Sequence, residues 1–175
     1  NGQSIAAAIA GPILDGRLPP ARAFRHHVAL GWVATTSEPV TIPVRGANIL
    51  IHGDPLSGKS WFAGSLMERL IIARHAVCIL DVEGDYGVLA RLPGVMSVGI
   101  DAPRDVERAL RLLERDPAAS LVLDLSALTH AGKLEAVEQG LHLVRALRQR
   151  IGRPHCVLLD EAHYTLHRSG VSGDL

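Results

Sequence analysis

Five short apolar runs alternate along the chain with segments of helical period. The runs are NILI (48–51), AVCILD (76–81), VMSVGI (95–100), SLVLDL (120–125) and CVLLD (156–160). Unbroken runs of this kind are typical of parallel strands that helices cover on both faces, because no side chain of such a strand faces water. The alternation therefore predicts an α/β fold in which a mostly parallel sheet is sandwiched by helices.

Three segments between these runs carry apolar residues at helical spacing, at 59–73, 103–115 and 134–150. We expect Asp101 to cap the second helix at its N-terminus and Gly152 to end the third. Two earlier stretches, VALGWVA (28–34) and PVTIPV (39–44), favour a short antiparallel β lead-in. A further short helix is expected at 4–10.

The size of the chain fits one domain core. We assign 1–22 to a linker or the tail of a preceding domain, 23–46 to the β lead-in, and 47–175 to the α/β core, truncated at its C-terminal end. The missing initiator Met suggests a fragment. Cys78 and Cys156 lie in apolar runs, which favours buried thiols in a reducing compartment, the cytoplasm. No apolar stretch approaches the roughly 20 residues of a membrane helix.

The motif with the clearest chemistry lies between the first apolar run and the first predicted helix. It fits the pattern G-x-x-x-x-G-K-[ST] and consists of Gly53, Asp54, Pro55, Leu56, Ser57, Gly58, Lys59 and Ser60. Between a strand and a helix, the backbone N–H groups of such a loop surround phosphate oxygens. We expect Lys59 to reach the β and γ phosphates of ATP and Ser60 to ligate Mg²⁺. The next residue, Trp61, could contact a base, but a position facing the sheet is favoured.

A second acidic element follows about one hundred residues later, where the run CVLLD ends in Asp160 and Glu161. A carboxylate at the end of a buried strand can hold Mg²⁺, and a neighbouring Glu can position or activate a water molecule. We assign the metal role to Asp160 and the catalytic role to Glu161. Asp124 is the reserve candidate, although a cap of the following helix is the preferred interpretation for it.

Other polar groups allow two interpretations each. The acidic turn with Asp81, Glu83 and Asp85 is either solvated or faces the nucleotide, and the sequence favours neither. His163 and His167 could share a metal, but surface positions are favoured. Four arginines near the end of the third helix could contact DNA or a neighbouring subunit's phosphate, but stabilisation of the helix end is favoured. They are Arg145, Arg148, Arg150 and Arg153.

Taken in order, ILIHGDPLSGKS, CILDVEGDY, SLVLDLS and PHCVLLDEAH resemble the HerA/FtsK superfamily of P-loop ATPases over about residues 40–166. The second element, a strand followed by Asp-x-x-Gly-acidic-Tyr, is the most typical of this group. The resemblance implies a RecA/ASCE-like core that binds ATP at 53–60 and hydrolyses it with Asp160 and Glu161. It also implies a hexameric ring, possible action on DNA, an arginine finger from the neighbouring subunit and a sensor strand after 156–160.

The charge balance and the motifs of the chain also allow functions other than a DNA motor. The 18 basic and 18 acidic residues give no net positive field, so any contact with DNA must be local or shared between subunits. A nucleotide-gated regulatory module without translocation is one alternative. The sequence Asp160-Glu161-Ala162-His163 suggests a DEAH-type helicase as another, but the chain lacks the Pro-Thr-Arg type of motif. A small-molecule kinase is less favoured, because Glu161 indicates transfer to water.

Overall fold

The computed structural model describes residues 27–44, 46 and 48–162. The chain divides into two compact units, one ending at Leu50 and the other beginning at Ile51. The helix expected at 4–10 and the pair His163 and His167 lie outside the described residues.

The first unit contains an antiparallel hairpin. Strand β1 (His27–Trp32) pairs with strand β2 (Pro39–Pro43), with a register shift between Ala29 and Gly31. The turn is closed by Val33, whose N–H donates to the carbonyl of Glu38 at 2.8 Å. The predicted β lead-in is therefore confirmed.

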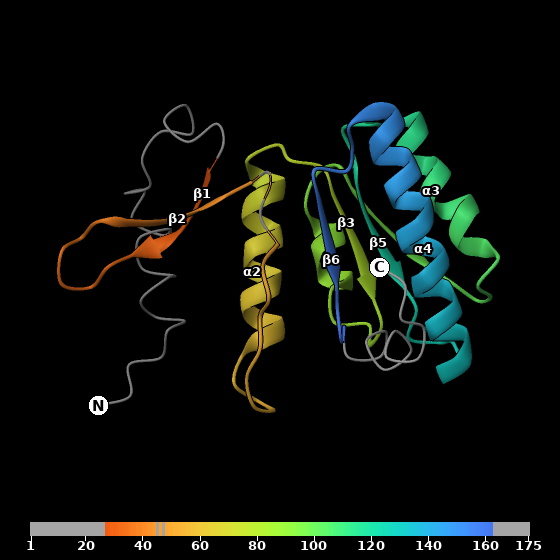
Figure 1. Cartoon of the computed structure of the whole chain (residues 1–175), viewed down its shortest axis with the longest axis horizontal. Helices are drawn as coiled ribbons and strands as arrows, with labels where there is room; N and C mark the ends of the chain where they lie inside the picture. Colours follow the sequence, from red (N-terminus) through yellow and green to blue (C-terminus); the bar gives the residue numbers. More distant parts are fainter. Residues whose placement is uncertain (1–26, 45, 47, 163–175) are drawn as a thin grey trace, which may run out of the picture. The chain divides into compact units, whose positions relative to one another are not determined.

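The second unit is built on a four-stranded parallel sheet. Its strands are β3 (Val77–Asp81), β4 (Val95–Gly99), β5 (Ser120–Asp124) and β6 (Cys156–Leu159). They lie in the order β4-β5-β3-β6, and every pair is parallel (Figure 1). Each strand lies within a predicted apolar run, so the predicted α/β class with a parallel sheet is confirmed. The central strands β3 and β5 are almost wholly buried.

The first predicted strand is wrong, because residues 48–51 form no strand in the structure. The side chain of Leu50 is 79% exposed and that of Ile49 is 48% exposed. An apolar run becomes a strand only when another strand satisfies its backbone N–H and C=O groups. Among the described residues none pairs with 48–51, and β3 already has a neighbour on each edge.

Helices cover both faces of the sheet. Helix α2 (Lys59–Ile72) lies on one side, and α3 (Asp105–Arg115) and α4 (His130–Ile151) lie on the other (Figure 1). The α3 and α4 side holds the main apolar core, in which Leu80 and Leu123 of the sheet pack with Val106 and Val137 of the helices. A short 3-10 helix, η2 (Gly87–Arg91), precedes β4. None of the described helices is both long and apolar enough to cross a membrane.

The helix ends only partly follow the prediction. Gly152 ends α4 in the left-handed conformation (φ 69°), as expected. Asp101 does not cap α3, whose N-cap position is Arg104 without a side-chain cap. Helix α4 begins four residues earlier than predicted, because the Thr129 hydroxyl accepts the N–H of Gly132 at 3.2 Å and so caps the first turn.

The two cysteines lie on neighbouring strands but on opposite faces of the sheet. Cys156 pairs with Val77, whereas Cys78 pairs with Val157. Successive side chains of a strand point to opposite faces, so the two thiols are on different sides. Cys78 is fully buried, which confirms the sequence prediction for it and raises the pKa of its thiol to about 12. Cys156 is only partly buried.

Candidate functional site

The loop with the G-x-x-x-x-G-K-S pattern leads directly into α2, as predicted, although no strand precedes it. Its shape depends on two glycines. A Cβ on Gly53 would lie 2.8 Å from the Ser57 hydroxyl oxygen, so no larger residue fits there without displacing Ser57. Gly58 is the N-cap of α2 and has a φ of 91°, a left-handed conformation that favours glycine. The loop therefore opens the helix with its backbone closely folded.

Lys59 lies at the start of α2 and turns back over the loop. Its Nζ donates a hydrogen bond to the carbonyl oxygen of Asp54 at 2.9 Å. This hydrogen bond connects the two ends of the loop, whose backbone N–H groups would surround an anion. A phosphate would offer the ammonium group a charged acceptor in place of a neutral one, and such hydrogen bonds are about twice as strong.

Asp160 and Glu161 follow directly after β6. The N–H of Asp160 donates to the carbonyl of Leu80 at 3.2 Å, which fixes this turn beside the end of β3. Burial, together with the nearby charges of Glu161, Asp81 and Asp85, raises the pKa of the Asp160 carboxyl to about 6, although the N–H of Glu161 donates to it and lowers the pKa somewhat. Glu161 has a φ of 49°, a conformation that costs a residue with a side chain about 1 kcal/mol or more. Strain of this kind is concentrated at functional sites.

Tyr86 connects the two elements, and the sequence reasoning gave it no role. Its hydroxyl is hydrogen-bonded to the hydroxyl of Ser60, and the Asp160 carboxylate lies close enough to raise its pKa. Burial is the larger cause of that raised pKa. Ser60 and Asp160, about one hundred residues apart in the chain, therefore both interact with one buried side chain. The signal was available in the sequence, since Tyr86 closes the Asp-x-x-Gly-acidic-Tyr element.

Asp81 is a structural carboxylate. It is fully buried, and its oxygens accept the N–H groups of Gly84 (2.8 Å), Asp85 (3.1 Å) and Tyr86 (2.9 Å). The side chain thus shapes the turn after β3. Glu83 of the same turn forms a 3.5 Å ion pair with Lys133 of α4. Neither acid is free to face a nucleotide without giving up these contacts.

Asp124 also has a local role, but not the one expected. Its carboxylate accepts the N–H of Ser126 at 2.9 Å, two residues further on. The cap of α4 is Thr129, so the preferred interpretation of Asp124 as a helix cap is wrong. The reason is that a turn of several residues separates the end of β5 from α4, which places Asp124 too early to cap the helix.

The donors near Tyr86 suit a hard cation. One hydroxyl (Ser60) and one half-buried carboxylate (Asp160) both interact with Tyr86, and the negative charges of Glu161, Asp81 and Asp85 lie close to that carboxylate. Among the described residues no group of three or more His, Cys, Asp or Glu side chains could hold a metal alone. This combination fits Mg²⁺, which is commonly held by one or two protein oxygens together with substrate phosphates.

Trp61 and the four arginines near the end of α4 lie at or near the protein surface. Trp61 is 50% exposed, so the expectation that it faces the sheet is wrong. Arg150 forms an ion pair with Glu114, and Arg153 donates to the carbonyl of Pro117 at 2.7 Å. These two arginines therefore join the end of α4 to the end of α3, in agreement with the favoured structural interpretation. Arg145 and Arg148 are exposed on α4.

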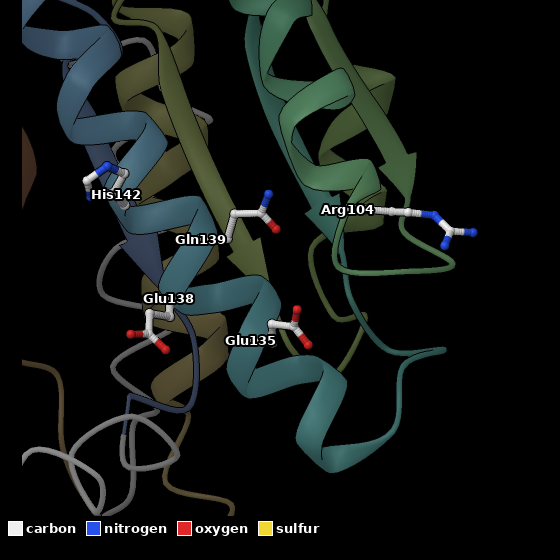
Figure 2. A pocket seen from close by; sticks show the side chains of 5 residues that line it. All are labelled: Arg104, Glu135, Glu138, Gln139 and His142. Carbon is white, nitrogen blue, oxygen red and sulfur yellow. The ribbon is translucent and has the colours of Figure 1, made fainter.

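A hollow of about 470 Å³ between α3 and α4 does not resemble a second site. Its lining residues are Arg104, Glu135, Glu138, Gln139 and His142. Figure 2 shows that these side chains do not converge, because Arg104 extends away from the four side chains on α4. The polar groups that do meet are those around Tyr86.

Comparison with known proteins gives one match. The family model described as "Helicase HerA, central domain" matches residues 29–150, well over half of the chain. The matched segment contains the loop at 53–60 and the turn from Asp81 to Tyr86, and it ends before Asp160 and Glu161. No curated protein and no solved structure matches the chain.

Proposed function

The chain belongs to the family of the HerA helicase central domain, and on this premise we propose that it binds ATP with Mg²⁺ and hydrolyses it. We further propose that hydrolysis drives a ring-shaped, hexameric motor that acts on DNA or in macromolecular transfer. A HerA-like ATPase domain follows from family membership, whereas hydrolysis, the ring and the substrate are proposals.

Each candidate residue has a defined task in this proposal. The backbone of 53–58 and the Lys59 ammonium group bind the phosphates, and Ser60 and Asp160 hold the metal. Mg²⁺, when bound, neutralises charge on the β and γ phosphates. Glu161 orients a water molecule and accepts its proton as the water attacks the γ phosphate. Trp61, half exposed one residue beyond the loop, is a candidate contact for the base.

The observation that carries the proposal is that Ser60 and Asp160 both interact with Tyr86, Ser60 by a hydrogen bond and Asp160 through its charge. A loop that matched the phosphate-binding pattern by chance would have no reason to share a buried partner with a carboxylate from a distant strand.

The decisive experiment is Glu161→Gln. We expect this variant to keep its affinity for ATP and to lose turnover by about 10²–10⁴-fold, because a general base is removed while the phosphate contacts stay. Steady-state ATPase assays and equilibrium binding of a fluorescent ATP analogue measure the two quantities. Glu135→Gln, on the exposed face of α4, is the matched control. Unchanged turnover in Glu161→Gln would refute the role of Glu161.

Lys59→Ala tests whether the loop at 53–60 binds phosphate. We expect ATP affinity to fall by about 10–100-fold, because a charge-assisted hydrogen bond to phosphate is worth about 1.5–3 kcal/mol. Lys133 is the only other lysine of the chain, so Lys133→Ala is a control of the same chemistry. Equal ATP affinity in Lys59→Ala and wild type would count against the loop.

A nucleotide-gated regulatory module is the second candidate function. It is favoured by the absence of net positive charge, since a DNA motor usually presents a basic surface. Duplex DNA should stimulate ATP hydrolysis at least severalfold if the protein is a DNA motor. No stimulation by DNA, together with intact hydrolysis, would favour the regulatory module or a motor with a protein substrate.

A further inference from the structure

Tyr86 belongs to the turn after β3, and its side chain reaches the start of α2. The residue is 2% exposed, so its ring belongs to the core while its hydroxyl reaches Ser60. Gly64 of α2 faces the ring, and a Cβ added there would lie 3.8 Å from the ring carbon Cε1. The ring therefore lies against the helix four residues beyond Ser60, at a distance that leaves room for a methyl group at Gly64.

The backbone of Tyr86 is fixed independently of its side chain. Its N–H donates to the Asp81 carboxylate at 2.9 Å, and the same carboxylate holds the two preceding N–H groups. The main chain at Tyr86 is thus held by a buried anchor at the end of β3, and the ring packs from there against α2.

From these contacts we infer that Tyr86 is a positioning residue for the metal ligand Ser60. A serine hydroxyl has one proton and two lone pairs, and a cation needs a lone pair. When Ser60 donates its proton to the Tyr86 oxygen, its lone pairs remain available for the cation that Asp160 would share. Without Tyr86 the Ser60 hydroxyl can rotate. The inference rests on the proposed function and adds a residue to it.

The test is Tyr86→Phe, which keeps the ring on Gly64 and removes the hydroxyl. We expect the Mg²⁺ concentration needed for half-maximal enhancement of fluorescent ATP-analogue binding to rise by about 3–10-fold, within the range for loss of one hydrogen bond. Binding of the analogue without Mg²⁺ should not change. Gly64→Ala, which touches the ring and leaves the hydroxyl, is the matched control and should keep the wild-type Mg²⁺ dependence.

A double-mutant cycle separates positioning from packing. If Tyr86 acts through Ser60, Tyr86→Phe should have no further effect on Mg²⁺ dependence in a Ser60→Ala background. An equal effect in both backgrounds, or an equal loss of analogue binding with and without Mg²⁺, would show that the phenol only packs and would overturn the inference.

A measurement on the unmodified protein covers the case in which Tyr86→Phe does not fold. The chain has two tyrosines, so ¹³Cζ labelling of tyrosine gives few resonances. We expect Mg²⁺ with ATP to shift the Tyr86 resonance and ATP without Mg²⁺ to leave it in place. The same position in both conditions would refute the inference alone. Wild-type protein that binds no nucleotide with or without Mg²⁺ would instead refute the proposed function.

Discussion

Asp81 and Asp160 follow neighbouring parallel strands, yet their surroundings differ. Asp81 closes β3, and three backbone N–H groups satisfy its carboxylate within 3.1 Å. Asp160 follows β6, and its carboxylate accepts the backbone N–H of Glu161. The negative charges of Glu161, Asp81 and Asp85 lie nearby. One carboxylate shapes a turn, whereas the other accepts fewer backbone N–H groups and lies among other negative charges. Position at the carboxyl edge of a sheet therefore does not by itself identify a ligand residue.

The largest effect on stability is expected for Asp81→Ala. This change leaves the buried N–H of Tyr86 and the part-buried N–H groups of Gly84 and Asp85 without their acceptor, which should lower the free energy of unfolding by about 2–4 kcal/mol. Urea unfolding followed by circular dichroism measures the change. Asp85→Ala, on the exposed side of the same turn, is the control and should cost about 0.5 kcal/mol or less. Similar losses in both variants would mean that Asp81 has no special structural role.

Asp160→Asn should raise the free energy of unfolding, whereas Asp81→Ala lowers it. The folded state holds the Asp160 proton more tightly than the unfolded chain, because the pKa of this carboxyl is raised from 3.8 to about 6. The wild type therefore loses stability as pH rises between these values and keeps the deficit above them. The neutral amide removes the deficit, so we expect a gain of about 1 kcal/mol at pH 7.5, allowing for solvent screening.

The pH dependence of that gain distinguishes titration from packing. It should be small near pH 4, where the carboxyl is protonated in the folded state and partly protonated in the unfolded chain, and should vanish below the ordinary pKa of 3.8. Thermal unfolding at pH 4, 5.5 and 7.5 without nucleotide is sufficient to see this. A gain that is the same at all three values, or a loss at pH 7.5, would contradict the picture of Asp160 as a carboxylate without enough partners.

Glu83→Gln should have the smallest effect. Its carboxylate pairs with Lys133 at 3.5 Å, and its side chain is 45% exposed. Exposed pairs of this kind are worth about 0.2–1 kcal/mol. We expect a loss of about 0.5 kcal/mol that disappears in 1 M NaCl, measured by urea unfolding at both salt concentrations. A loss as large as that of Asp81→Ala would show that the whole acidic turn acts as one unit.

The fold was largely predictable because its elements have strong periodic signals. The apolar runs of β3, β5 and β6 alternate with helical segments, and a parallel sheet covered by helices is the structure that buries such runs most readily. Residues 48–51 show the limit of this reasoning, because an apolar run says nothing about whether a partner strand exists. The cap of α4 shows another limit, since a loop of unknown length separates a strand end from the helix that follows.

The candidate site was predictable only in part. The loop at 53–60 and the acids at 160 and 161 follow local patterns that can be read along the chain, and their roles remain predictions. The role of Asp81 could not be read, because the same Asp-Val-Glu-Gly-Asp-Tyr letters fit a solvated turn or a ligand. Tyr86 was missed because its partner Ser60 lies 26 positions earlier, and sequence spacing does not indicate which side chains of a helix and a distant turn meet.

The placement of the two sulfur atoms limits how this protein responds to oxidants. Cys78 and Cys156 are the only cysteines of the chain, and the sheet itself separates their side chains. A disulfide needs Cβ atoms within about 4.5 Å that point toward each other, which adjacent strands with opposed side chains do not provide. Oxidative damage in this fold must therefore stop at single-sulfur products or join two molecules through the more accessible Cys156.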